Sequence, residues 1–457
     1  MTREIRLNAF DMNCVGHIQH GMWTHPRDRS SDYTDLAYWT ELARTLERGL
    51  FDGIFLADVV GVYDVYAGSP DAALRHAVQV PVNDPMLLIP AMAAVTRNLG
   101  FGVTCNTSYE PPYLFARRMS TLDHLTRGRI GWNIVTGYLD SAARGMGQER
   151  QTAHDDRYDR ADEYMSLVYR LWEASWEDGA VLRDRAGGVF TDPARVHPVV
   201  QTSGAYRMNA IHLCEPSPQR TPVLYQAGSS ERGRRFAAEH AECVFLNASG
   251  KQNVASLAAD IRARAEASGR DRRDLVMFVG ASVVVGRTER EARDKLEDYR
   301  RHASVEGALV HFSAGTGFDF AQFGMDEPIE HRRTEANQSN VEAITSRSQQ
   351  VWTKRKLIDS FVLGSRQPPI VGSAEQVADA LQAWVAECDI DGFNLSRVVA
   401  PECVTDFVDL VVPVLQERGA FKRAYAPGTL REKLFGEGSA RLPPTHPARR
   451  VRVNEPV

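Results

Sequence analysis

The sequence predicts a (β/α)₈ TIM barrel with insertions at the C-terminal face of its strands, on three observations. Short apolar runs of strand length recur along the 457 residues, and each precedes a longer segment with helical periodicity. Eight such runs are present, as the barrel requires. Several of the helical segments also carry capping signals at their ends. A doubly wound open sheet is the alternative.

The eight predicted strands alternate with predicted helices. The strands cover residues 5–10, 53–60, 100–105, 129–136, 222–228, 243–247, 276–285 and 392–396. Helices are expected at about 34–48, 84–99, 113–126, 156–175, 230–241, 252–268, 287–302, 373–387 and 405–418. Asp84 can cap the second of these, Pro85 fits its first position, and Gly100 follows its end. Ser373 and Gln376 have the spacing of a capping box.

Three stretches do not fit the repeat and are interpreted as insertions in a single domain covering 1–457. They lie at about 61–82, 177–220 and 304–371. The last is too long for an idle loop, which favours a lid or a pocket wall. The tail from about 420 to 457 is rich in proline and basic residues, and we expect it to wrap the surface or a partner subunit.

Composition excludes several classes of protein. Lysine and arginine number 54 against 59 aspartate and glutamate, a net charge of −5, so a nucleic-acid partner is not expected. The six cysteines form no C-x-x-C pair, which is typical of isolated thiols in a reducing compartment. The chain shows no signal peptide and no apolar stretch long enough for membrane insertion, so we expect a cytoplasmic protein.

Active sites of such barrels lie at the carboxyl ends of the strands, which selects the residues after each apolar run. These include Asp58, Thr104, Asn106, Thr136 and Tyr138. The stretch "QAGSSERGRRF" ends a strand in Ala227 and Gly228, then places Ser229 and Ser230 before a helix. This arrangement suits a phosphate, although the serines can equally serve only as helix caps. His154 and Tyr158 share one helical face near a helix start, where they could donate to a phosphate or simply be exposed.

The stretch "DMNCVGHIQHGMW" (11–23) leaves three interpretations open. His17 and His20, with His25 nearby, could bind a metal, but no further ligand pattern accompanies them, so no metal site is expected. Cys14 could be a nucleophile with His17 as its base, although an inert buried thiol is commoner. The stretch could also form the wall of a cofactor pocket.

Five stretches carry a resemblance to a known family. They are "NAFDMNCVGHIQHG", "FDGIFLADVVGVYDVY", "RRMSTLDHLTRGRIGWNIVT", "HDDRYDRADEY" and "PVLYQAGSSERGRRFAAEHAECVFL". Together they resemble the bacterial-luciferase-like flavin monooxygenases, and within them the branch of nitrilotriacetate, dibenzothiophene-sulfone and long-chain alkane monooxygenases. The first 100 residues and the ending "TLREKLFGEGSARLPP" are most similar to the alkane enzymes.

The resemblance implies a two-component FMNH2-dependent monooxygenase. FMN arrives reduced from a separate NAD(P)H:flavin reductase, reacts with O2 to a flavin hydroperoxide, and one oxygen atom enters a small apolar substrate. That substrate is expected to be a long-chain alkane, or an aromatic, organosulfur or halogenated compound. Relatives suggest a homodimer or homotetramer. The alternatives are a deazaflavin-dependent oxidoreductase on the same barrel and a non-catalytic flavin-binding protein.

The implied site residues fall into two groups. The cofactor-binding candidates are Asp58, Thr104, Thr136, His154, Tyr158, Ala227, Gly228, Ser229 and Ser230. The catalytic candidates, expected to line the cavity over the flavin ring, are Cys14, His17, Tyr63, Tyr138 and His311. Tyr138 departs from the histidine expected in the alkane-oxidising enzymes, so the flavin chemistry transfers more directly than the substrate does. The resemblance therefore favours the pocket-wall interpretation of residues 11–23.

Overall fold

A closed barrel of eight parallel strands forms the centre of the computed structural model, which describes residues 4–334, 336, 338–346, 348, 350–363 and 367–452. The strands are β1 (Arg6–Met12), β2 (Gly53–Ala57), β3 (Gly100–Asn106), β4 (Ile130–Val135), β9 (Val223–Gln226), β10 (Cys243–Leu246), β11 (Val276–Gly286) and β13 (Gly392–Ser396). Each pairs with the next, and β13 pairs with β1 to close the ring. The predicted barrel and its eight strands are confirmed, and the open sheet is excluded.

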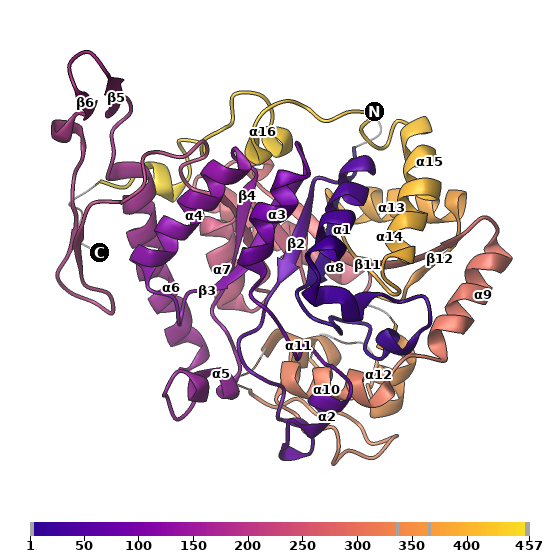
Figure 1. Ribbon diagram of the computed structural model, residues 1–457. Helices are drawn as coiled ribbons and strands as arrows, with labels where there is room; N and C mark the ends of the chain where they lie inside the picture. The colour runs from indigo at the N-terminus through magenta and orange to yellow at the C-terminus, as the bar shows by residue number, and fades with distance from the viewer. Residues whose placement is uncertain are drawn as a thin grey trace.

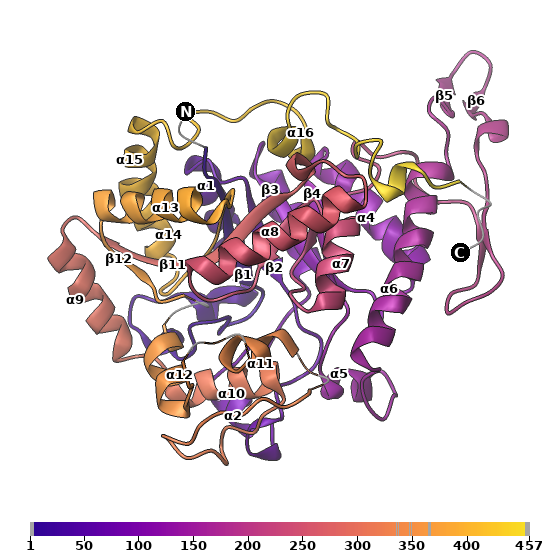
Figure 2. The same ribbon diagram turned by 180° about the vertical axis from the view of Figure 1, so that it is seen from behind.

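Helices surround this barrel (Figures 1 and 2). They are α1 (Leu36–Arg48), α3 (Ile89–Ala94), α4 (Pro112–Thr126), α6 (His154–Tyr169), α7 (Glu231–His240), α8 (Lys251–Ala267), α9 (Glu289–Arg300), α13 (Ala374–Cys388), α14 (Glu402–Asp406) and α15 (Val412–Glu417). The capping box of Ser373 and Gln376 is present. Asp84 caps a 3₁₀ turn, Pro85–Leu88, that leads into α3. This helix ends at Ala94, well before Gly100, and the Glu47 carboxylate then accepts the backbone N–H groups of residues 97–99.

One strand of the main sheet, β12 (Ile370–Ser373), was not predicted. It pairs with Val283–Gly286, the last residues of β11, outside the barrel. The barrel partner β13 pairs only with residues 278–282 of β11, so the eleven-residue strand extends beyond it. That free length provides the edge that β12 occupies.

Two of the three insertions lie at the carboxyl ends of the strands, as expected. Residues 61–82 contain α2 (Asp71–Arg75), and 304–371 contain α10 (Val305–Thr316), α11 (Gln338–Ile344) and α12 (Lys354–Phe361). With α5 (Asp140–Gly145) they form a layer below the barrel in Figure 1. Residues 335, 337, 347, 349 and 364–366 of the long insertion are outside the described residues.

The third insertion, 177–220, does not lie at the carboxyl ends for most of its length, although the Tyr206 hydroxyl reaches the Thr107 carbonyl just after β3. It forms the hairpins β5 (Val181–Asp184) with β6 (Val189–Thr191) and β7 (Val199–Gln201) with β8 (Met208–Ala210). The segment joins the helical turn after α6 to the amino end of β9, and a helix-to-strand connection in a parallel barrel leads to the amino side. Figure 1 shows the β5–β6 hairpin projecting at that side, away from α2 and α10.

Part of the tail is more deeply buried than the surface wrap that we expected. Its helix α16 (Leu430–Phe435) covers the amino ends of the strands, at the same end of the molecule as the N-terminus (Figure 1). Leu430 and Leu434 belong to a buried cluster with Phe55, Tyr225 and Phe278 from three barrel strands. The tail therefore completes the core at the end of the barrel opposite the insertions 61–82 and 304–371. Residues 453–457 lie outside the described residues.

Candidate functional site

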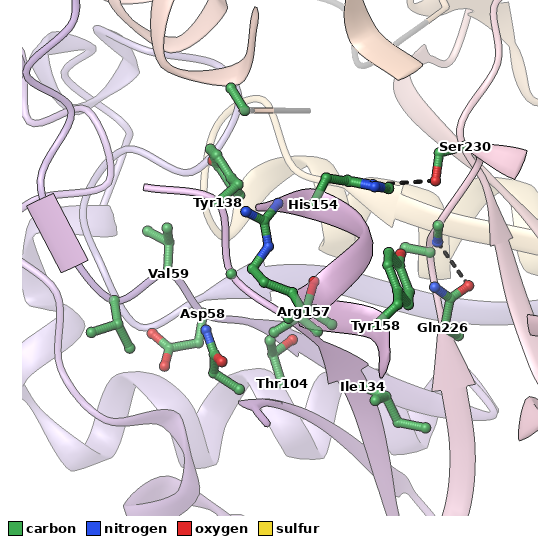
Figure 3. A pocket seen from close by; sticks show the side chains of 18 of the residues that line it. Asp58, Val59, Thr104, Ile134, Tyr138, His154, Arg157, Tyr158, Gln226 and Ser230 are labelled. Atoms are coloured by element: carbon green, nitrogen blue, oxygen red, sulfur yellow. Dashed lines mark hydrogen bonds between the residues drawn. The ribbon is translucent and has the colours of Figure 1, made fainter. Parts of the chain in front are cut away.

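An open cavity lies at the carboxyl ends of β2, β3, β4 and β9 and encloses about 940 Å³, counting its mouth (Figure 3). Its lining comprises Asp58, Val59, Val60, Thr104, Asn106, Ile134, Val135, Thr136, Gly137, Tyr138, His154, Arg157, Tyr158, Gln226, Ala227, Gly228, Ser229, Ser230 and Ala336. All nine residues expected to bind the cofactor are in this set. The closed barrel therefore brings together, around one cavity, residues that lie far apart in the sequence.

The geometry of the serine loop shows the helix cap and is compatible with the phosphate interpretation that the sequence also left open. Ser230 caps α7, since its Oγ accepts the Gly233 N–H at 3.0 Å, and the same Oγ lies 3.4 Å from His154 Nε2. Ser229 is 2% exposed, and its Oγ has no hydrogen-bond partner among the described residues. A buried hydroxyl without a partner at the edge of a cavity is suited to bind a polar ligand group.

The backbone of the serine loop packs tightly against its neighbours, and this packing depends on two glycines, Gly228 and Gly233. Gly228 donates its N–H to Gln226 Oε1 at 2.7 Å (dashed in Figure 3). A Cβ on Gly228 would lie 2.7 Å from the Tyr158 hydroxyl oxygen and 2.9 Å from Gly233 Cα. Glycine is therefore needed here for the loop to pack against α6 and α7, which presents the backbone to the cavity. Gln226 was missed as a site residue, although it lies within the predicted strand 222–228 and is the last residue of β9.

Arg157 is the most important residue that the sequence reasoning missed. It lies in the first turn of α6, one residue before Tyr158, and Figure 3 shows its side chain within the cavity lining. It is 2% exposed, and its Nη1 donates to the Thr152 carbonyl at 2.6 Å. This places a guanidinium charge beside the imidazole of His154 and the amino end of α6. Its position between the two predicted residues, His154 and Tyr158, was the available signal.

The other side of the cavity is formed by the ends of β2 and β3. Burial, together with the nearby charge of Asp84, raises the pKa of Asp58 to about 7, so this carboxyl group changes its charge near neutrality. Thr104 Oγ1 accepts a hydrogen bond from Asn133 Nδ2 at 2.9 Å. With one lone pair engaged in this way, the Thr104 hydroxyl proton is available to donate.

Of the five catalytic candidates, Tyr138 lines the cavity, and Cys14, His17, Tyr63 and His311 are not among the lining residues. The Tyr63 hydroxyl is 3.0 Å from that of Tyr138 and donates to Gln79 Oε1 at 2.6 Å. Gln79 Nε2 donates to the His17 carbonyl at 2.6 Å, and the His311 ring stacks on Tyr63 at 5.6 Å. Residues 11–23 thus contribute, through the His17 carbonyl, to a hydrogen-bonded layer behind Tyr138.

The nucleophile and metal interpretations of residues 11–23 gain no support. Burial raises the pKa of Cys14 well above its usual range, and a protonated thiol is a poor nucleophile. His25 forms a group of three possible metal ligands with Asp298 and His302, whose ligand atoms lie within 4.8 Å of one another, and neither His17 nor His20 belongs to this group. His25 Nε2 contacts Asp298 at 3.0 Å and its Nδ1 accepts the Arg27 N–H at 3.2 Å, so both ring nitrogens are engaged.

Comparison with known proteins decides the family. The family model described as "Luciferase-like monooxygenase" matches residues 17–389. The chain belongs to this family. Its sequence is 50% identical over 452 residues to a long-chain alkane monooxygenase of Geobacillus thermodenitrificans, covering 99% of each chain. It is 48% identical over 453 residues to a dimethyl-sulfide monooxygenase of Hyphomicrobium sulfonivorans, covering 99% of this chain and 94% of that one.

Comparison with solved structures leads to the same family for this chain. A crystal structure of long-chain alkane monooxygenase superposes with a TM-score of 0.91 at 49% identity, covering 98% of this chain and 100% of that one. A riboflavin lyase crystallised with modified FMN and riboflavin gives 0.92 at 37% identity, covering 98% and 99%. The predicted family and enzyme class, a flavin-utilising monooxygenase, are confirmed. Within the described residues, no helix has the length and apolar character to cross a membrane.

Proposed function

We propose that this luciferase-like monooxygenase takes reduced FMN from a separate NAD(P)H:flavin reductase and inserts one atom of O2 into a small apolar substrate. The observation that supports this best is the polar end of the cavity. Ser229, Ser230 and the first N–H groups of α7 lie opposite the start of α6 with His154 and Arg157. Hydroxyls, a guanidinium and a helix N-terminus are together the donor set that suits a phosphate dianion.

Two further features are compatible with a bound phosphate. The Ser229 Oγ has no hydrogen-bond partner among the described residues, and glycine at 228 leaves the loop backbone open to the cavity. In the proposal Ser229, Ser230, His154, Tyr158 and Arg157 hold the phosphate. Asp58, Thr104 and Thr136 lie deeper, at the strand ends, where they would meet the ring and its ribityl chain.

Bound reduced FMN supplies the electrons that activate O2, so that one oxygen atom enters the substrate and the other leaves as water. The protein has to exclude bulk water and orient the substrate. In this proposal the insertions 61–82 and 304–371 exclude water, since they form the layer over the carboxyl ends of the strands. Tyr138, held through Tyr63 and Gln79, presents a fixed hydroxyl at the cavity surface.

The substrate class is proposed from the two relatives of similar identity, one named for long-chain alkanes and the other for dimethyl sulfide. Both names denote small apolar molecules. The polar Tyr63–Tyr138 pair lies where the substrate would approach, so a substrate with a lone pair, such as a sulfide, is as well suited as an alkane.

The decisive experiment supplies the chain with FMN, NADH, a generic flavin reductase and ¹⁸O2 in the presence of alkanes, sulfides and halogenated aromatics. Mass spectrometry should find one labelled oxygen atom in one substrate class, and none when the chain is omitted. Turnover that persists under nitrogen would instead indicate hydride transfer, as in a deazaflavin enzyme. The expected homodimer or homotetramer stays a prediction, to be measured by light scattering.

A further inference from the structure

A pair of histidines lies behind the cavity wall, where the loop after β1 meets α10. His20 Nε2 is 2.9 Å from His311 Nδ1. The His311 ring stacks on Tyr63, whose hydroxyl reaches that of Tyr138 at the cavity surface. The pair is thus linked to the cavity through two tyrosines.

The ring of His20 is held in one place by close neighbours. The residue is 1% exposed. A Cβ on Gly16 would lie 3.2 Å from His20 Nδ1, and a Cβ on Gly307 would lie 2.9 Å from His20 Cβ, so the imidazole occupies a slot between two glycines. The Ser304 N–H donates to the His20 carbonyl at 2.8 Å, which ties the loop to the start of α10. These contacts keep Nε2 directed at His311.

The surroundings of His20 decide which ring donates. Its Nδ1 is buried with no hydrogen-bond partner among the described residues. A proton there would be a buried donor without an acceptor, which proteins rarely tolerate. Burial and the neighbouring His311 and His17 lower the pKa of His20 well below its usual range, so the ring is neutral. A neutral ring that avoids a proton on Nδ1 carries it on Nε2 and donates it to His311.

We infer that His20 is a positioning residue that fixes His311 in the tautomer with its proton on Nε2. Because His311 Nδ1 accepts from His20, the ring keeps its own N–H on the other nitrogen. The consequence for catalysis rests on the proposed function: in the layer behind Tyr138, His311 then keeps a donor N–H on Nε2 and does not act as a base. The tautomer itself is a property of the protein without flavin.

The test uses flavin-free protein labelled with ¹⁵N-histidine. Long-range ¹H–¹⁵N correlation distinguishes protonated from unprotonated ring nitrogens, and the His311 signals are identified by their loss in His311→Gln. The wild type should show an unprotonated Nδ1 and a protonated Nε2. His20→Phe keeps an aromatic ring at this position but loses the N–H donor. In this variant the ¹⁵N shifts of His311 Nδ1 and Nε2 should converge as the two tautomers exchange. In His20→Gln, whose amide can donate, the separation should return.

The matched control is His76→Gln. His76 contacts Ser304 and Glu306 at the start of the same helix, so its loss should leave the His311 signals in place. A wild-type spectrum with the proton on His311 Nδ1 would overturn the inference even if His20→Phe fails to fold. So would unchanged His311 shifts in a folded His20→Phe, or an equal shift in the control. None of these results depends on flavin or turnover, so the proposed function is tested separately.

Discussion

Arg431 and Glu242 form a buried ion pair that joins the C-terminal segment to the barrel. Arg431 Nε lies 2.7 Å from Glu242 Oε1 and Nη2 lies 3.0 Å from Oε2, with both side chains at most 2% exposed. Arg431 Nη2 also donates to the Thr221 and Pro222 carbonyls. Glu242 accepts the Leu224 N–H at 3.0 Å. The pair thus ties α16 to β9 at the amino end of the barrel, opposite the cavity.

Arg431→Met should lower the free energy of unfolding by about 3–5 kcal/mol, because the Glu242 carboxylate is left buried without its partner. Urea denaturation at neutral pH measures the change. The double variant Arg431→Met/Glu242→Gln should recover part of the loss, since it removes the uncompensated charge. A single variant as stable as the wild type would show that the pair is dispensable.

Ser229→Ala should weaken FMN binding by about 1–2 kcal/mol, which is roughly 5- to 30-fold in Kd, because one hydrogen bond to the phosphate is lost. Its thermal stability should not change, since Ser229 Oγ bonds to no described residue. Ser230→Ala should reduce both affinity and stability, because that hydroxyl also caps α7. Calorimetric titration and thermal melts of the two variants separate these effects.

Arg157→Met should reduce affinity for FMN by roughly tenfold or more while affinity for riboflavin, which lacks the phosphate, changes little. Arg157→Lys should restore part of the FMN affinity, because it keeps the charge without the planar guanidinium. Fluorescence quenching of each flavin measures both constants. Equal losses for FMN and riboflavin would place Arg157 away from the phosphate.

Asp58→Asn should stabilise the flavin-free protein at alkaline but not at acid pH. The folded pKa of Asp58, about 7, is raised from its ordinary 3.8 by burial. Below pH 3.8 both folded and unfolded chains hold the proton, so this group contributes nothing. Between the two values the unfolded chain releases its proton first, and the folded state of the wild type loses stability as the pH rises.

The advantage of Asp58→Asn should therefore grow from near zero at pH 4 to a plateau above pH 7. The plateau should reach up to about 4 kcal/mol, since a tenfold change in proton affinity is worth about 1.4 kcal/mol. Denaturation curves of both proteins across this range measure it. A constant difference at all pH values would exclude titration of Asp58 as the cause.

Most of the candidate site could be predicted from the sequence, because its residues lie at the ends of the predicted strands. Asp58, Thr104, Thr136 and the serine loop each follow an apolar run, and closing the barrel brings them together. Arg157 and Gln226 were missed because their roles depend on which way a side chain points across the cavity. Tyr63 and His311 were expected to line the cavity, but packing places them behind Tyr138.

Local patterns by themselves determined the eight barrel strands, most of the helices and the capped serine loop, because hydrophobic periodicity and capping involve residues close in sequence. Only the tertiary structure decided the rest: the insertion 177–220 at the amino side, α16 as the closure of the barrel, β12 on the free end of β11, and the pairing of His20 with His311. Each of these depends on contacts between residues far apart in the chain. Such contacts arise only when the barrel has closed, so no local pattern records them.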